Sequence, residues 1–236
     1  MTTLRPALDP AIRGAIAART EALFRASGAL RDGHFQLKSG RHGDAYVEKF
    51  AVLSNPAATS ELCGFFAAPH LATTVDSASA PGSAGGEGVA VDIVAGPTTG
   101  GVILAFETGR QLGVPAIFAE EVRDPDGPTR RAFRRGFRIE SGQRVLLVDD
   151  ILTTGGSLLA MIPAVEAMGG EIIECAVLVD RSGGRSTLTS PASGRVYAVR
   201  SLWQLDLPTY DPGVANCPGC AVASPLHAPG STGAAG

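Results

Sequence analysis

Long apolar runs are absent from this sequence. No segment approaches the roughly 20 apolar residues that a membrane-spanning helix requires. The N-terminus, Met-Thr-Thr-Leu-Arg-Pro, also lacks the apolar core of a signal peptide. The sequence therefore predicts a cytosolic protein that has no membrane partner.

An excess of positive charge is also absent. The 236 residues include 20 Lys and Arg against 23 Asp and Glu, which gives a formal net charge of −3. Because a nucleic-acid-binding protein usually presents a basic surface, this balance argues against nucleic acid as a partner. The length suits one α/β domain with appendages better than two full domains.

Cysteine is scarce. Cys63 and Cys175 lie in apolar segments and are expected to be reduced core residues. Cys217 and Cys220 have the spacing of a zinc knuckle or a redox pair, but a structural zinc site takes four ligands, and no second pair lies close by in the sequence. We therefore predict no metal site built from protein residues, and we interpret the pair as a feature of the C-terminal tail.

The most informative stretch is Val145 to Ser157, which reads Val-Leu-Leu-Val-Asp-Asp-Ile-Leu-Thr-Thr-Gly-Gly-Ser. Its four consecutive apolar residues predict a short strand that is buried on both faces. Asp149 and Asp150 follow at the carboxyl end of this strand. A loop of hydroxyl residues and glycines then leads into a predicted helix, Leu158 to Met168, which a pair of glycines ends.

The residue types of this unit suit a sugar phosphate. Backbone N–H groups at a helix N-terminus bind anions, glycines allow a phosphate to approach closely, and hydroxyl groups add donors. The two carboxylates can accept hydrogen bonds from a ribose diol. The lysine of a P-loop is missing, so this is not a Walker A site. The alternative is an ordinary helix capped by Thr153 or Ser157, but a cap requires neither two acids nor two adjacent glycines.

This stretch resembles the phosphoribosyl-pyrophosphate (PRPP) binding motif of type I phosphoribosyltransferases. Other segments narrow the resemblance to the orotate phosphoribosyltransferases of a short bacterial subtype, which often carry a cysteine pair before a Pro-Gly-Ser ending, as this chain does. The resemblance covers about residues 10 to 220, with a gap in the middle. It implies PRPP contacts for Asp149, Asp150, Ile151, Leu152, Thr153, Thr154, Gly155, Gly156 and Ser157.

A β-hairpin is predicted from His34 to Lys49, where apolar and polar residues alternate on both sides of a turn. Taken alone, Lys38 on this turn would be a solvated residue. Its context, Phe-x-Leu-Lys-Ser-Gly-Arg, resembles the hood segment of orotate phosphoribosyltransferases. That resemblance implies that Lys38 reaches PRPP and that Tyr46 and Val47 lie over the base.

A second unit of strand, glycine turn and helix begins at Val89 and reads Gly-Pro-Thr-Thr-Gly-Gly at its turn. A second anion-binding loop is therefore physically reasonable here. The resemblance assigns pyrophosphate to this loop and implies PRPP contacts for Thr98, Thr99 and Gly100. Many family members carry a tyrosine and a lysine in place of the two threonines, so backbone amides are expected to make the contact in this chain.

Arginines gather between Glu121 and Arg138, after the turn sequence Asp-Pro-Asp-Gly-Pro, and are expected to enter a hairpin. On charge alone, a solvated face explains such a run equally well. In the family this connection is the mobile catalytic loop, which often reaches the neighbouring subunit's site, and this implies a homodimer. The lysines and the His-Gly step of the most familiar version are missing, so the catalytic candidates are Arg130, Arg131, Arg134 and Arg135.

Arg181 follows a predicted strand, Ile172 to Val179. Its guanidinium offers the two-pronged geometry that a carboxylate prefers, and orotate carries a carboxylate. The alternative is a surface arginine at a strand end. The resemblance implies that Arg181 binds orotate and that Thr153 also touches it.

The alternation of strands and helices predicts an α/β fold with a parallel, doubly wound sheet flanked by helices. The resemblance makes it a type I phosphoribosyltransferase-like fold with a small N-terminal hood. We expect an N-terminal helix and hood at 1–55, a core at 56–205 with a flexible insertion at 73–88, and a tail at 206–236. The further elements expected are helices at Pro10 to Gly28 and Pro56 to Ala68, a strand at Pro115 to Glu120, and an edge strand at Arg195 to Val199.

The leading hypothesis is transfer of the phosphoribosyl group of PRPP to orotate, giving orotidine 5′-phosphate and pyrophosphate in pyrimidine synthesis. This transfer passes through a cationic sugar and requires neutralisation of the departing pyrophosphate. Mg²⁺, bound mainly through PRPP and water, is expected to supply part of that neutralisation. One alternative is a purine or other base phosphoribosyltransferase, which should lack Lys38 and Arg181. The other is a regulator that binds PRPP without catalysis, which should add a nucleic-acid-binding segment.

Overall fold

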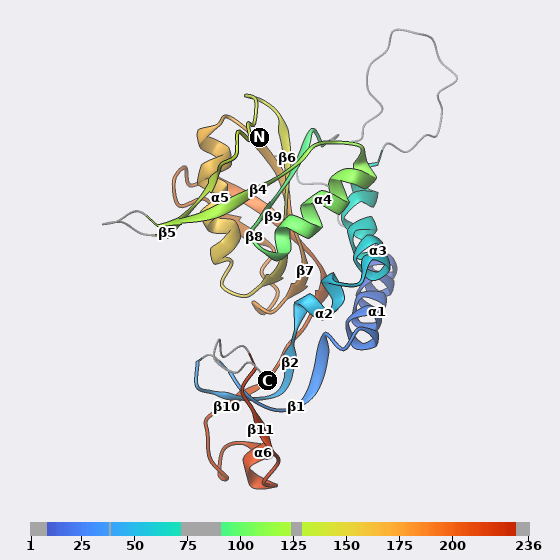
Figure 1. The fold of residues 1–236 in the computed structure, drawn as a ribbon, viewed down its shortest axis with the longest axis vertical. Helices are drawn as coiled ribbons and strands as arrows, with labels where there is room; N and C mark the ends of the chain where they lie inside the picture. Colours follow the sequence, from blue (N-terminus) through green and yellow to red (C-terminus); the bar gives the residue numbers. More distant parts are fainter. Residues whose placement is uncertain (1–8, 38, 72–90, 124–128, 230–236) are drawn as a thin grey trace.

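The computed structural model describes residues 9–37, 39–71, 91–123 and 129–229 (Figure 1). The predicted insertion at 73–88, the turn at 124–128 and Lys38 lie outside the described residues. Within the described ranges, no helix combines the length and the apolar character that crossing a membrane requires.

The larger sheet has seven strands in the order β5-β4-β3-β6-β7-β9-β8. The central five, from β4 to β9, are parallel, and β5 and β8 run antiparallel to them at the two edges. The predicted α/β fold is therefore confirmed, and β4 and β5 form the hairpin expected for the arginine segment. In chain order the strands are β3 (Ile93–Pro97), β4 (Ala116–Arg123), β5 (Thr129–Phe133), β6 (Arg144–Leu152), β7 (Glu171–Asp180), β8 (Thr187–Thr189) and β9 (Val196–Gln204).

Strands β6 and β9 both extend well past their predicted ends. Strand β6 continues four residues past Val148, because its backbone stays paired with β7 as far as Leu152, and the two acids therefore lie inside the strand. Strand β9 extends past Val199, because Leu202 and Trp203 continue into the buried core. The expected edge strand is thus an inner strand, and β8 forms the edge beside it.

Helices cover both faces of this sheet (Figure 1). Side chains alternate along β6: Leu146 packs in a core cluster with four helices on one face, while Leu147 packs in a second cluster with α5 on the other. The strand is therefore buried on both faces, as predicted. The helices on the first face are α1 (Pro10–Ala26), α2 (Lys49–Leu53), α3 (Pro56–Ala67) and α4 (Gly100–Leu112), and the second face carries α5 (Gly156–Ala167).

A smaller, four-stranded sheet forms the hood, in the order β10-β2-β1-β11. Its antiparallel centre is the predicted hairpin of β1 (Leu30–Gln36) and β2 (His42–Val47). The segment predicted as a tail adds β10 (Thr209–Tyr210) and β11 (Leu226–His227) to its edges, with α6 (Pro218–Ala221) between them. The hood thus combines a hairpin from the first fifth of the sequence with the C-terminal segment, as the blue and red ribbons at the bottom of Figure 1 show.

Candidate active site

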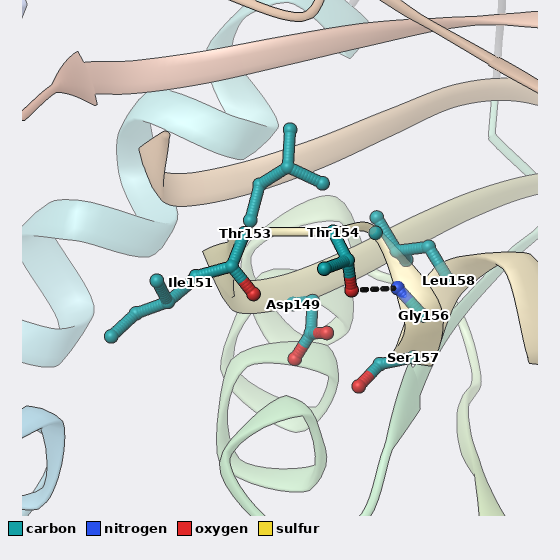
Figure 2. Close-up of a pocket in the computed structure, with 9 residues that line it drawn as sticks. Asp149, Ile151, Thr153, Thr154, Gly156, Ser157 and Leu158 are labelled. Atoms are coloured by element: carbon teal, nitrogen blue, oxygen red, sulfur yellow. Dashed lines mark hydrogen bonds between the residues drawn. The ribbon is translucent and has the colours of Figure 1, made fainter. Parts of the chain in front are cut away.

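A hollow of about 190 Å³ lies between the carboxyl end of β6 and the start of α5 (Figure 2). Because drug-sized pockets usually measure roughly 300–1,000 Å³, this hollow suits a phosphate group with part of a sugar. The side-chain oxygens of Asp149, Thr153 and Ser157 point toward the space in front of the loop in Figure 2. All but the last of its lining residues were predicted to contact PRPP: Asp149, Ile151, Leu152, Thr153, Thr154, Gly155, Gly156, Ser157 and Leu158.

The loop before α5 leaves the N-terminus of the helix open to a ligand. Gly155, the N-cap residue, has a φ of 85°, and no side chain caps the helix, so the alternative of Thr153 or Ser157 as a cap is wrong. A side chain at Gly155 would be strained and would also meet Leu188. The Gly156 N–H does donate to Thr154 Oγ1, at 3.3 Å. The other amides of the first turn are oriented to bind an anion.

The two acids of β6 are almost fully buried, Asp149 at 6% and Asp150 at 5% exposure. Asp149 Oδ1 accepts from the Asp150 N–H at 2.9 Å, and Asp150 Oδ1 accepts from the Ile151 N–H at 2.8 Å. Burial raises the pKa of Asp149 above its ordinary value, and the negative charge of Asp150 raises it further. Adjacent buried acids with a perturbed pKa are typical of a functional site.

Lys49 is a site residue that the sequence reasoning missed. Its Nζ lies 2.7 Å from Asp150 Oδ2, and its charge opposes the rise in the pKa of Asp149. A buried acid pair predicts that a cation lies nearby. The sequence could not identify this cation, because Lys49 reaches the acids from the far end of the hood hairpin, at the first residue of α2.

The loop between β3 and α4 lies against the acids. A Cβ at Gly100 would overlap Asp150 Oδ2, and a Cβ at Gly96 would overlap the carbonyl of Gly101. Both glycines are therefore required for this close approach. Thr99 is the N-cap residue of α4 and makes no side-chain capping bond, so this helix also presents unpaired amides. The structure thus places the second predicted anion-binding loop against the acid pair that precedes the first.

The four candidate arginines do not act as one group. Arg131 donates from Nη1 to Thr98 Oγ1 at 2.7 Å, and its charge also opposes the rise in the pKa of Asp149. Arg135 instead pairs with Glu120 at 2.7 Å, and its side chain is 64% exposed. Arg130 lies on β5 and Arg134 directly follows this strand, and both residues are exposed. Among the contacts of these four that the structure describes, the bond from Arg131 to Thr98 is the one that reaches the candidate site.

Arg181 lies beside the glycine loop that precedes α5, at the end of the neighbouring strand β7. Leu152 and Asp180 are register partners, and the Arg181 N–H donates to the Leu152 carbonyl at 2.7 Å, so Arg181 lies next to Thr153. Arg181 Nε is buried and has no hydrogen-bond partner among the described residues. Burial lowers the pKa of this guanidinium, and Asp206 opposes that effect. A carboxylate ligand would supply the missing partner.

The described contacts of the predicted base-binding residues of the hood, Tyr46 and Val47, are with other residues of the protein. Val47 is 8% exposed and belongs to the core cluster, so it has a packing role. The Tyr46 ring packs against Phe35, with 5.6 Å between ring centroids. Contact of either residue with a base stays a prediction. Arg41, beside the hairpin turn, donates to the Thr209 carbonyl at 2.7 Å and ties the turn to β10.

The donors at this site fit Mg²⁺ only with help from a substrate. Asp149 and Asp150 offer hard carboxylate oxygens, which Mg²⁺ prefers, but one oxygen of Asp150 is paired with Lys49. Two carboxylates do not complete the octahedral shell of this ion. The remaining positions would be filled by substrate oxygens and water.

Comparisons with known proteins agree with this geometry. The phosphoribosyl transferase domain family matches residues 85–194. The orotate phosphoribosyltransferase of Methylobacterium sp. (strain 4-46) is 40% identical over 187 residues, covering 79% of this chain and 83% of that protein. The orotate phosphoribosyltransferase of Chlorobium phaeobacteroides (strain DSM 266 / SMG 266 / 2430) is 39% identical over 209 residues, covering 89% and 93%.

Solved structures show the same fold. Orotate phosphoribosyltransferase from Aeropyrum pernix aligns with a TM-score of 0.57 at 22% identity, over 78% of this chain and 92% of that one. The Mycobacterium tuberculosis H37Rv enzyme in complex with inorganic phosphate aligns with a TM-score of 0.55 at 26% identity, over 81% and 96%. Adenine phosphoribosyltransferase from Rhodothermus marinus also aligns, at 0.55 and 22% identity, over 80% and 99%. The fold by itself therefore does not determine the base.

Proposed function

Because the chain belongs to the orotate phosphoribosyltransferase family, we propose that it transfers the phosphoribosyl group of PRPP to orotate, giving orotidine 5′-phosphate and pyrophosphate. The observation that carries this proposal is a hollow lined by Asp149 of the buried acid pair and by an uncapped glycine loop, beside which lies Arg181 with a buried, unpartnered Nε. The reaction is that of a pentosyltransferase in de novo pyrimidine synthesis. We also propose a cytosolic location, since all four cysteines are unpaired, as in a reducing compartment.

PRPP would lie along the carboxyl ends of β3 and β6. The amides and hydroxyls of the loop from Thr153 to Ser157 would bind the 5-phosphate, and Asp149 and Asp150 would accept from the ribose hydroxyls. The pyrophosphate would lie on the loop of Thr98, Thr99 and Gly100, with Lys38 as a further PRPP contact. Bound Mg²⁺ would neutralise part of the charge that develops on the leaving pyrophosphate.

The base would lie between the phosphate loop and the hood. Arg181 would pair with the orotate carboxylate, Thr153 would contact the ring, and Tyr46 and Val47 would border it from the hood. Since the orotate ring nitrogen can attack as an anion, the reaction needs no strong general base. The role of the protein is then to orient both substrates and to stabilise the charge of the leaving group.

A purine phosphoribosyltransferase is the main competitor, because its fold is shared. A half-buried guanidinium whose buried Nε has no partner suits a base with a carboxylate better than adenine, which has none. The decisive experiment incubates purified protein with PRPP, Mg²⁺ and one base at a time, and then measures nucleotide formation. We expect turnover of orotate and very little turnover of uracil or adenine. Efficient turnover of uracil would contradict the assignment.

The role of Arg181 is tested in the same assay. Arg181→Ala should raise the KM for orotate by about 30- to 100-fold, which corresponds to the roughly 2–3 kcal/mol of a charge-assisted pair. The KM for PRPP should change little. Arg185→Ala is the matched control, because Arg185 is an exposed arginine on the same loop. An equal rise in both KM values for Arg181→Ala would place this residue outside the orotate site.

We further propose that the active unit is a homodimer in which the arginines divide their roles. The bond between Arg131 and Thr98 supports action of Arg131 within its own subunit. Arg130 and Arg134 are the candidates for reaching a partner's site. The two roles can be separated by mixing subunits. In a mixed dimer, activity is recovered only where the substituted residue normally acts in the partner's site.

The common partner in these mixtures is the Asp149→Asn/Asp150→Asn subunit. Mixed with Arg130→Ala/Arg134→Ala, it should recover activity at one of the two sites of each mixed dimer. Mixed with Arg131→Ala, it should recover none, since neither site would then hold both the acids and Arg131. Recovery with Arg131→Ala, in verified mixed dimers, would assign that residue to the partner's site instead.

A further inference from the structure

Four metal-binding side chains meet in the hood. His34 comes from β1, His42 from β2, Cys217 is the N-cap residue of α6, and Cys220 lies within that helix. Their ligand atoms all lie within 4.8 Å of one another. The sequence showed no second pair of metal ligands near the cysteines. The other two ligands are histidines that lie far away in the sequence, with His34 183 residues before Cys217.

The distances between these atoms match a tetrahedral ion. With Zn–S near 2.3 Å and Zn–N near 2.0–2.1 Å, tetrahedral ligands lie roughly 3.4–3.8 Å apart. His34 Nε2 lies 3.4 Å from Cys217 Sγ and 3.7 Å from Cys220 Sγ, and His42 Nδ1 lies 3.3 Å from Cys220 Sγ. The two ring nitrogens are closer, at 2.8 Å, and a modest ring movement would open the site.

The surroundings hold His34 in the orientation that a ligand requires. Its Nδ1 lies 3.0 Å from the Ser224 carbonyl, so Nδ1–H donates there and Nε2 keeps its lone pair for the ion. Gly219, between the two cysteines, packs directly on this ring, and a Cβ at Gly219 would lie 2.5 Å from His34 Cγ. Only glycine allows the Cys-Pro-Gly-Cys turn to come this close.

Burial makes the cluster a closed site. His34 and His42 are 5% exposed and Cys217 is 2% exposed. Four protein ligands leave no position for a substrate, which is the pattern of structural zinc sites. Sulfur and imidazole ligands select zinc over Mg²⁺, so this site is distinct in chemistry from the acid pair.

We propose that His34, His42, Cys217 and Cys220 bind one structural zinc ion that fastens the C-terminal segment to the hood. The segment needs such a fastener, because β10 and β11 have two residues each, and α6 has four residues, none of them buried. Its large apolar residues Val214, Val222 and Leu226 are exposed, so they contribute little to holding the segment in place. A metal ion commonly supplies the missing stability in such small units.

The test measures the metal content of tag-free protein by plasma mass spectrometry. We expect about one zinc per chain in the parent protein. Cys217→Ser and Cys220→Ser should lower the content at least fivefold, and His34→Gln should act likewise. The matched controls, Cys63→Ala and His227→Gln, should keep the zinc, because Cys63 lies in the core and His227 is an exposed residue of the same hood.

Substitution with Co²⁺ provides a second readout that does not depend on how the variants fold. The parent protein, stripped of metal and titrated with Co²⁺, should develop the visible absorption of a tetrahedral site with thiolate ligands, and zinc should abolish it. Two outcomes would overturn the proposal: reduced parent protein that takes up neither metal, or a Cys217–Cys220 disulfide in protein purified without reductant. Neither outcome bears on the transferase reaction, which is measured separately.

Discussion

Carboxylates on two neighbouring strands of the sheet, Asp149 and Asp150 on one and Glu174 on the other, are all largely shielded from solvent but behave in opposite ways. Asp149 and Asp150 stand at the carboxyl end of β6, where burial and mutual repulsion raise the pKa of Asp149. Glu174 stands on β7 between His70, at 3.1 Å, and Arg200, at 2.8 Å. Burial acts to raise the pKa of Glu174 too, yet the bonds from His70 and Arg200 outweigh it and lower the pKa to about 2.

The difference lies in the partners. The Glu174 side chain is 14% exposed and so slightly less buried than the two acids, but burial acts to raise its pKa as well. Glu174 has hydrogen-bond partners on both sides, His70 and Arg200. Arg200 also donates to the carbonyls of Phe65 and Phe66, so this network holds α3 against the sheet. In the acid pair of β6, Asp150 is paired with Lys49, and Asp149 lines the hollow. A buried acid with a complete set of partners stabilises the fold, whereas an incompletely paired one is available to a ligand.

The largest effect is expected from neutralising the acids. Asp149→Asn/Asp150→Asn should lower kcat/KM by about 1,000-fold or more, equivalent to roughly 4 kcal/mol, because the ribose hydroxyls lose their acceptors. Steady-state kinetics and calorimetric PRPP binding measure this loss, and circular dichroism checks the fold. Glu171→Gln, an exposed acid on β7, is the control. Unchanged PRPP affinity in the double variant would refute the assignment.

Glu174→Gln should show the reverse pattern, with reduced stability and nearly unchanged kcat. Removing one partner of a buried ion pair leaves Arg200 uncompensated, so the free energy of unfolding in urea should fall by roughly 2–4 kcal/mol. The lowered pKa means that this stabilisation is present above the unfolded pKa of Glu and is lost as the pH falls toward about 2. The gap between parent and variant should therefore close in acid. If Glu174→Gln were as stable as the parent protein at pH 7, Glu174 would have no structural role.

The smallest effect concerns Asp149 alone. Since its pKa is raised in the folded state, ionisation opposes folding, and the cost grows as the pH rises from about 4 toward the folded pKa. Asp149→Asn should therefore increase the free energy of unfolding at pH 8 by on the order of 1 kcal/mol, while it impairs activity. Urea unfolding at pH 4 and pH 8 measures this, and the gain should vanish at pH 4. A variant less stable than the parent at pH 8 would contradict the comparison.

The sequence by itself determined the local units of this protein. The apolar run of β6, the acids and the glycine loop are contiguous, and their residue types specify a strand, a turn and an open helix N-terminus without reference to the rest of the chain. The hood hairpin and the β4–β5 hairpin follow from alternation and turn residues in the same way. The placement of Arg181 beside Thr153 was implied by resemblance, and the register of β6 with β7 accounts for it.

Only the tertiary structure decided which distant residues meet. Lys49 reaches Asp150, Arg131 rather than Arg135 reaches the site, and the C-terminal segment closes the hood. The pairing of His34 with Cys217 is of the same kind. Each depends on strand order and on the path of the chain between elements. Local propensity carries no information on either, because the free energy of such contacts arises only when the whole sheet and hood have formed.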